Sequence, residues 1–342
     1  MSEFRRDVTT GSWVLIAPER SKRPRDWRAE HRPQASVPSF DPSCQFCPGN
    51  EHLLPGIISE VLTDPAPGWR LRVVPNKYPA VRPDLALALE TTDTETLDGY
   101  GSHRVIIETP RHNADFDALT DVEAASVLKT YQAQFAELAQ QPGIKSVIMF
   151  RNRGVRAGAS LQHPHSQIIS LGMVAPRLAA ADAWARENYA RTRACVSCRY
   201  IEAELRDRRR VIEETEHFVA LVPFAAAGPF EMHLLPLRHE ASFARAEARE
   251  LAELASLLPC AVRRLKAVVG DAPYNFIIDS AITTEPIPYL HWRLRIVPEL
   301  VVPGDFELGA GLPINPSQPE EDAEHLRATE RQASPPVRPV SG

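Results

Sequence analysis

Short apolar runs separated by proline- and glycine-containing turns dominate the first half of the chain, and this pattern predicts strands. The predicted strands cover residues 13–16, 71–75, 105–109, 147–150 and 163–169. A helix is predicted after Thr120, which can form a capping box with Glu123. The apolar stripe of this helix is Leu128, Tyr131, Phe135 and Leu138.

The second half repeats this order of elements. Its predicted strands cover residues 217–223, 230–236, 275–279 and 289–298, and its predicted helix covers 246–268. The spacing from His112 to His163 is 51 residues, and the spacing from His239 to His291 is 52. This near-identity predicts a duplicated α+β unit. We expect one unit over residues 1–180, a second over 181–327 and a disordered tail over 328–342.

Length and composition narrow the class of protein. The chain has 342 residues, of which 44% are hydrophobic, enough for a sizeable core. A net charge of −5 and a pI near 6.1 argue against a nucleic-acid binder. No apolar run approaches the roughly 18–20 residues that span a bilayer, and the N-terminus has no apolar signal region. We therefore expect a cytoplasmic protein without a membrane or nucleic-acid partner.

Four of the five cysteines form two C-x-x-C pairs. Such a pair in a cytosolic protein is either a redox motif or half of a zinc site. A structural zinc site needs two further ligands, usually histidine or cysteine. The fifth cysteine, Cys260, lies in an apolar helical stretch and is predicted to be a small buried hydrophobe.

The repeat supplies those further ligands, because each half offers a C-x-x-C pair, a histidine after a strand and the first histidine of its last strand. Two zinc ions per chain are expected, each in a Cys2His2 set. The alternative is one true site, with the other pair packing or redox-active. The two predicted sets are Cys44, Cys47, His112 and His163, and Cys195, Cys198, His239 and His291.

The segment from Gly158 to Ile169 contains His163, His165 and Gln167 at alternate positions. Alternate side chains of a strand leave the same face, so these three are expected to point into one site. Two histidines on a strand also fit an ordinary core or surface, and the repeat decides between these interpretations. In the second half Arg293 and Arg295 replace His165 and Gln167. We therefore expect the second unit to keep the metal ligands and to lack the nucleophile.

Several longer motifs together carry a family resemblance. They are Arg-Arg-Asp-x-x-Thr-Gly-x-Trp-Val-Leu-Ile-Ala-Pro from Arg5, Pro-Asn-Lys-Tyr-Pro at 75–79, Phe-Arg-Asn-Arg-Gly at 150–154 and His-Pro-His-x-Gln at 163–167. From Arg5 to about Arg327 the chain resembles the galactose-1-phosphate uridylyltransferase family of the histidine-triad superfamily. The resemblance implies an α+β fold of two fused histidine-triad-like units, antiparallel sheets with packed helices, bound zinc and a homodimer. It also implies double displacement through a nucleotidyl-histidine.

The resemblance also implies roles for single residues. His165 would be the nucleophile, with Gln167 beside it, and His163 a zinc ligand. The basic run from Arg20 to Arg25, which alone fits a solvated surface, then matches an arm that reaches the neighbouring subunit's substrate. The residues that would contact the nucleotide, the phosphates or the sugar are Arg20, Arg23, Asn76, Lys77, Asn152, Ser160 and Phe306.

The residue types fit this chemistry independently. A neutral imidazole can attack an α-phosphorus if a backbone carbonyl holds its other nitrogen. Gln167 cannot act as a general acid or base near neutral pH, so it would protect the covalent intermediate from hydrolysis.

We therefore expect transfer of UMP from UDP-glucose to galactose 1-phosphate. Residues 305–315 lack the charged grip on the hexose found in the best-known members and look more like ADP-glucose phosphorylases. A nucleotide-sugar phosphorylase is thus the alternative enzyme. A zinc-scaffolded nucleotide-binding protein is the alternative without catalysis, and it would require an inactive nucleophile.

Overall fold

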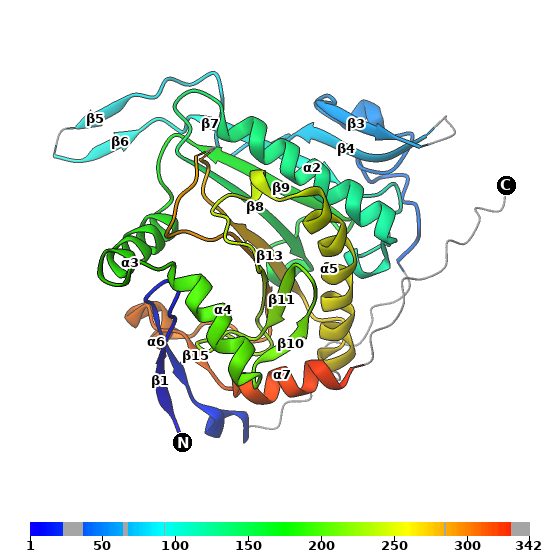
Figure 1. Cartoon of the computed structure of the whole chain (residues 1–342). Helices are drawn as coiled ribbons and strands as arrows, with labels where there is room; N and C mark the ends of the chain where they lie inside the picture. Colours follow the sequence, from blue (N-terminus) through cyan, green and yellow to red (C-terminus); the bar gives the residue numbers. More distant parts are fainter. Residues whose placement is uncertain (23–36, 64–67, 92, 284, 330–342) are drawn as a thin grey trace.

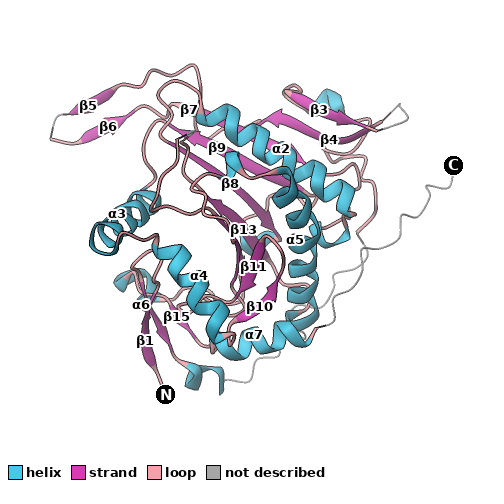
Figure 2. Ribbon diagram, viewed as in Figure 1, coloured by secondary structure: helices cyan, strands magenta, loops and turns pink. Residues whose placement is uncertain are grey.

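A computed structural model describes residues 1–22, 37–63, 68–91, 93–283 and 285–329. A single ten-stranded sheet, antiparallel throughout, forms its centre (Figures 1 and 2). In spatial order the strands are β10 (Val211–Glu214), β11 (Phe218–Leu221), β12 (Met232–Pro236), β14 (Arg293–Pro298), β13 (Tyr274–Asp279), β8 (Ser146–Arg153), β9 (His165–Leu171), β7 (Gly101–Ile107), β4 (Trp69–Pro75) and β3 (Ser59–Leu62).

The strand order confirms the internal duplication. The first half contributes β3-β4-β7-β9-β8 and the second half β10-β11-β12-β14-β13, so each strand has a counterpart at the same distance from the middle. The halves meet where β8 pairs antiparallel with β13 and Asn152 lies opposite Asn275. The two units therefore share one continuous sheet; the repeat predicted the duplication but not this joining.

Two long helices cover one face of the sheet. They are α2 (Asp121–Ala139) and α5 (Ala248–Val269), which contact each other and the strands beneath (Figure 1). α2 begins at the predicted Thr120–Glu123 capping box. Its predicted stripe is fully buried against apolar side chains of both halves, and Cys260 of α5 is buried as expected.

The opposite face has an apolar cluster at each of its two ends, and polar and apolar residues together in its middle. One cluster contains Phe46, Trp69 and Ile107, and the other Tyr200 and Leu221. Between them, cross-strand pairing places Gln167, Phe150, Ile277 and Arg295 in one row across the sheet. Residues in such a row lie on the same face of the sheet, so Gln167 of the first unit and Arg295 of the second unit face the same side.

The remaining elements frame this face, and the sequence pattern did not predict most of them. The helices are α3 (Pro176–Thr192), α4 (Val196–Asp207), α6 (Asp305–Ala310) and α7 (Pro319–Ala328). A small sheet contains β1 (Glu3–Arg6), β2 (Trp13–Ile16) and β15 (Ile314–Asn315), and a hairpin joins β5 (Leu89–Thr91) to β6 (Glu95–Leu97). The short 3-10 helices are η1 (Pro18–Lys22), η2 (Glu51–Leu53), η3 (Phe116–Ala118), η4 (Val155–Ala157) and η5 (Phe243–Arg245). No helix in the described ranges is long and apolar enough to cross a membrane.

Candidate functional site

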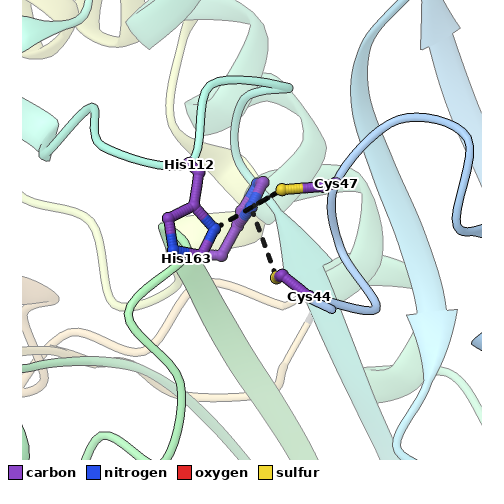
Figure 3. Close-up of side chains that lie close together, drawn as sticks. All are labelled: Cys44, Cys47, His112 and His163. Carbon is purple, nitrogen blue, oxygen red and sulfur yellow. Dashed lines mark hydrogen bonds between the residues drawn. The ribbon is translucent and has the colours of Figure 1, made fainter. Parts of the chain in front are cut away.

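The first predicted cysteine–histidine set comes together in the fold. One ligand atom from each of Cys44, Cys47, His112 and His163 lies within 4.8 Å of the others, and all four residues are buried (Figure 3). The Sγ atom of Cys47 lies 3.4 Å from Nδ1 of His112 and 3.6 Å from Nδ1 of His163. The Sγ atom of Cys44 lies 3.8 Å from Nδ1 of His163.

Local contacts prepare these groups to bind a metal ion. The backbone N–H groups of Asp41 and Phe46 donate to the sulfurs of Cys47 and Cys44, at 3.3 and 3.4 Å. Nε2 of His163 lies 2.8 Å from a backbone carbonyl and donates to it, which leaves the Nδ1 lone pair facing the cysteines. Burial lowers the pKa of His163 to about 4, so the ring is neutral. This donor set fits a closed tetrahedral zinc site.

The second predicted set is also assembled, at the corresponding place in the other half. Sγ of Cys198 lies 3.2 Å from Nδ1 of His239 and 3.5 Å from Nδ1 of His291, with Cys195 beside them. His291 donates through Nε2 to the carbonyl of Pro236, as His163 does to the carbonyl of Thr109. His239 is more exposed than any member of the first set. The residues of both sets therefore fit a metal ion.

His165 is the first residue of β9, and its environment suits a nucleophile. Its Nδ1 lies 2.8 Å from the carbonyl oxygen of His163 and donates to it, so Nε2 carries the free lone pair. In the described part of the chain, Nε2 has no hydrogen-bond partner. The ring packs 5.3 Å from that of Phe46, and burial lowers its pKa. At neutral pH the imidazole is therefore uncharged and able to attack.

The expectation that three alternate side chains point into one site was wrong for His163. The strand begins at His165, and His163 turns to the cysteines instead. Pro164 between them has no N–H and cannot donate to the ladder, which explains the late start of the strand. His165 and Gln167 do share a face, as predicted.

The side chain of Gln167 is held by two residues from neighbouring strands. Its Oε1 lies 2.7 Å from Nε2 of His103 and 3.3 Å from Nδ2 of Asn76. The resemblance implied a role for Asn76, whereas no motif in the sequence indicated one for His103. Its alternation with Val105 and Ile107 on the next strand could have shown that it shares the face of His165.

Beneath the strand, on the helix-covered face, lies a buried polar network that sequence reasoning also missed. Glu108 pairs with Arg151 at 3.0 Å and accepts hydrogen bonds from Tyr131 and Ser166. Ser166 stands between His165 and Gln167 in the chain. The network therefore anchors the strand that carries the candidate nucleophile.

The other predicted substrate contacts are placed unevenly. Asn152 is half-buried at the end of β8, where a Cβ on Gly158 would come 3.2 Å from its Nδ2. Gly158 has a φ of +88°, a conformation that favours glycine, and a side chain there would also press on Asn152. Lys77, Ser160, Arg20 and Phe306 are exposed, whereas Arg23 lies outside the described residues. Among the described residues, no hydrogen bond or ring contact joins Arg20 or Phe306 to His165.

The second half has no nucleophile at the matching position. Arg293 and Arg295 both pair with Asp279, at 3.0 and 2.7 Å, and their charges hold the pKa of this buried carboxyl well below its usual range. A cavity of about 480 Å³, lined in part by Arg177 and Arg293, adjoins them. Arginine guanidinium groups can bind anions but do not attack phosphorus at neutral pH.

The fold and the site define a duplicated α+β protein with a neutral, backbone-held histidine beside a buried cysteine–histidine set. Comparison with known proteins agrees. Residues 1–175 match the family described as galactose-1-phosphate uridyl transferase, N-terminal domain, and residues 182–294 match its C-terminal domain. The chain belongs to the galactose-1-phosphate uridylyltransferase family, whose members are nucleotidyl-transferring enzymes.

Relatives of two named activities match along nearly the whole chain. An ADP-glucose phosphorylase from Arabidopsis thaliana is 34% identical over 95% of this chain and 92% of its own length. A galactose-1-phosphate uridylyltransferase from Thermotoga maritima is 27% identical over 96% of this chain and 99% of its own. The crystal structure of the Arabidopsis phosphorylase with bound ADP-glucose superposes with a TM-score of 0.83, covering 97% of this chain and 100% of that one. A uridylyltransferase structure, 28% identical, gives 0.75 over 96% and 98%.

Proposed function

We propose that the protein transfers a nucleotidyl group from a nucleotide sugar to a phosphate oxygen through a covalent intermediate on His165. The observation that carries this proposal is the neutral ring of His165, held at Nδ1 by a carbonyl and free at Nε2. Nε2 attacks the α-phosphorus, and the bond from phosphorus to the bridging oxygen breaks, releasing the sugar 1-phosphate. An acceptor phosphate oxygen then attacks the same phosphorus, the phosphorus–nitrogen bond breaks, and His165 returns to its starting state.

Neighbouring side chains stabilise the charge that develops on the phosphoryl oxygens. Gln167, Asn152 and Ser160 offer uncharged hydrogen-bond donors, which lower the barrier when they are already oriented. Gln167 cannot pass a proton to or from water, so the intermediate survives until the acceptor arrives. Zinc held by Cys44, Cys47, His112 and His163 would supply rigidity to the loops around His165 and no step of the reaction.

The first specific form of this proposal is transfer of UMP from UDP-glucose to galactose 1-phosphate. It is supported by the family matches to both halves of the chain and by the uridylyltransferases among the relatives. In this form we also propose a homodimer, in which Arg20 and Arg23 of one subunit reach the phosphate in the other. Arg20 is exposed and Arg23 lies outside the described residues, so this part is supported by the sequence resemblance alone.

The second form is phosphorolysis of ADP-glucose, in which inorganic phosphate is the acceptor. Two observations favour it. The relative with this name is 34% identical over 95% of the chain. In addition, Phe306 is 52% exposed on α6, and residues 308–315 carry no charged side chain that could hold a hexose.

A donor and acceptor panel separates the two forms. Metal-replete protein is incubated with UDP-glucose or ADP-glucose, each with galactose 1-phosphate or inorganic phosphate, and the products are quantified. A hexose-phosphate site leaves its sugar-binding groups unpaired when phosphate alone is present, so the first form predicts poor use of phosphate. Turnover with phosphate equal to that with galactose 1-phosphate, or ADP-glucose as the better donor, supports the second form. No product in any combination would contradict nucleotidyl transfer itself.

A further inference from the structure

Two backbone amides determine which atoms around Gln167 can donate. The N–H of Tyr78 donates to Oδ1 of Asn76 at 2.8 Å, so the other end of this side chain is its NH2 group. The N–H of Ala80 donates to Nδ1 of His103 at 3.1 Å. A nitrogen that accepts a hydrogen bond carries no proton, so the proton of the His103 ring is on Nε2.

The two donors defined in this way converge on one acceptor. Nε2–H of His103 lies 2.7 Å from Oε1 of Gln167, and the NH2 group of Asn76 lies 3.3 Å from the same oxygen. If the amide of Gln167 were turned over, its NH2 group would face both of these donors. Nδ2 of Asn76 and Nε2 of His103 also lie 3.1 Å apart, but both atoms carry protons in this assignment and cannot bond to each other. Only one orientation of the Gln167 amide therefore offers an acceptor to both donors.

We propose that His103 is a positioning residue that fixes the orientation of the Gln167 amide, so that its NH2 group and not its oxygen faces the reacting phosphoryl group. This inference rests on the proposed nucleotidyl transfer through His165. An amide oxygen facing the phosphoryl oxygens would repel the charge that grows on them, whereas N–H groups stabilise it. The contribution is made at the transition state, so loss of His103 lowers the rate of adduct formation more than the affinity for the donor.

The loop from Asn76 to Ala80 orients both donors that contact Gln167. The backbone N–H of Tyr78 fixes the amide of Asn76, and the backbone N–H of Ala80 fixes the protonated nitrogen of His103. The Pro-Asn-Lys-Tyr-Pro motif thus acts on the reaction through Gln167 as well as through its own substrate contact.

The test is a double-mutant cycle on the single-turnover rate of nucleotidyl-His165 formation. His103→Asn is the chosen variant, because its amide oxygen can take the place of Nδ1 and keep the bond from Ala80 while the donor to Gln167 is lost. We expect His103→Asn to slow adduct formation about tenfold, with little change in donor KM. Gln167→Ala should slow it about a hundredfold. If His103 acts through Gln167, adding His103→Asn to Gln167→Ala should change the rate by less than about twofold.

Two results of this double-mutant cycle would contradict the proposed role of His103. If the two effects multiply, or if His103→Asn alone leaves the rate unchanged, the inference is wrong. The matched control is His325→Ala on α7, a helix well separated from β9 in Figure 1, and it should keep the wild-type rate. A wild-type protein that forms no adduct contradicts the proposed function, whereas an adduct with multiplying effects contradicts only the role of His103.

A second readout does not depend on turnover. In protein labelled with nitrogen-15 in its histidine rings, chemical shifts separate protonated from unprotonated ring nitrogens, and the His103→Asn variant assigns the signal. We expect Nε2 of His103 to be protonated and Nδ1 to be unprotonated at neutral pH. The opposite tautomer would overturn the inference, because Nε2 could then only accept.

Discussion

Converting the carboxylate of Glu108 to an amide tests whether the buried network under β9 stabilises the fold. Glu108 is 1% exposed and Arg151 is 2% exposed. Nε of Arg151 lies 3.1 and 3.0 Å from the two carboxylate oxygens. In the variant Glu108→Gln, the buried guanidinium loses its main counter-charge.

The structure sets the expected size of the effect. Removing one partner of a buried ion pair costs about 3–5 kcal/mol, because the other charge stays buried. Asp115 still lies 2.9 Å from Nη2 of Arg151, and the amide oxygen can still accept from Tyr131. Both features reduce the loss, so we expect the low end of the range, about 3 kcal/mol.

The assay is urea unfolding of metal-replete protein, with the wild type and a matched control at the same pH. The control is Asp182→Asn, which breaks the exposed pair with Arg186 and should change the unfolding free energy by about 0.5 kcal/mol or less. A loss for Glu108→Gln no larger than that of the control would refute the argument. Unchanged binding of two metals in the variant would show that the loss does not arise from metal release.

Three further predictions address the metals, the amide and a buried acid. Metal analysis should find two zinc ions per chain, and Cys198→Ser should lose one while keeping the other; a wild type with a single zinc would contradict the second site. Gln167→His should raise the ratio of hydrolysis to transfer, because an imidazole exchanges protons near neutral pH; an unchanged ratio would mean that water is excluded by other means. Burial raises the pKa of Asp322 from 3.8 to about 7, so the folded state binds the proton more tightly and stability falls as pH rises through that window. In Asp322→Asn the unfolding free energy should vary less over this range, and an undiminished slope would count against the assignment.

The sequence predicted those parts of the site that depend on spacing along the chain. Both cysteine–histidine sets follow from the matching intervals of the repeat, and each is assembled in the fold. The capping box at Thr120 and the buried stripe of α2 follow from local pattern alone. Such features need no knowledge of which strands lie together.

The residues that sequence reasoning missed depend on strand register. His103 reaches Gln167 across β7 and β9, which are separated by 64 positions at that contact. Glu108 and Arg151 meet from 43 positions apart on the helix-covered face. A one-residue shift in register would move each side chain to the other face of the sheet. The paired strands therefore had to be known before these contacts could be predicted.

The covalent intermediate on His165 is the central claim, and peptide mass spectrometry tests it most directly. Metal-replete protein is mixed with UDP-glucose or ADP-glucose without an acceptor and digested under mildly alkaline conditions. We expect one added nucleoside monophosphate on the peptide that contains His165, and its removal when the matching acceptor is supplied. The His165→Ala variant should show neither the adduct nor turnover. Full transfer activity in His165→Ala, or an adduct on another residue, would contradict the account.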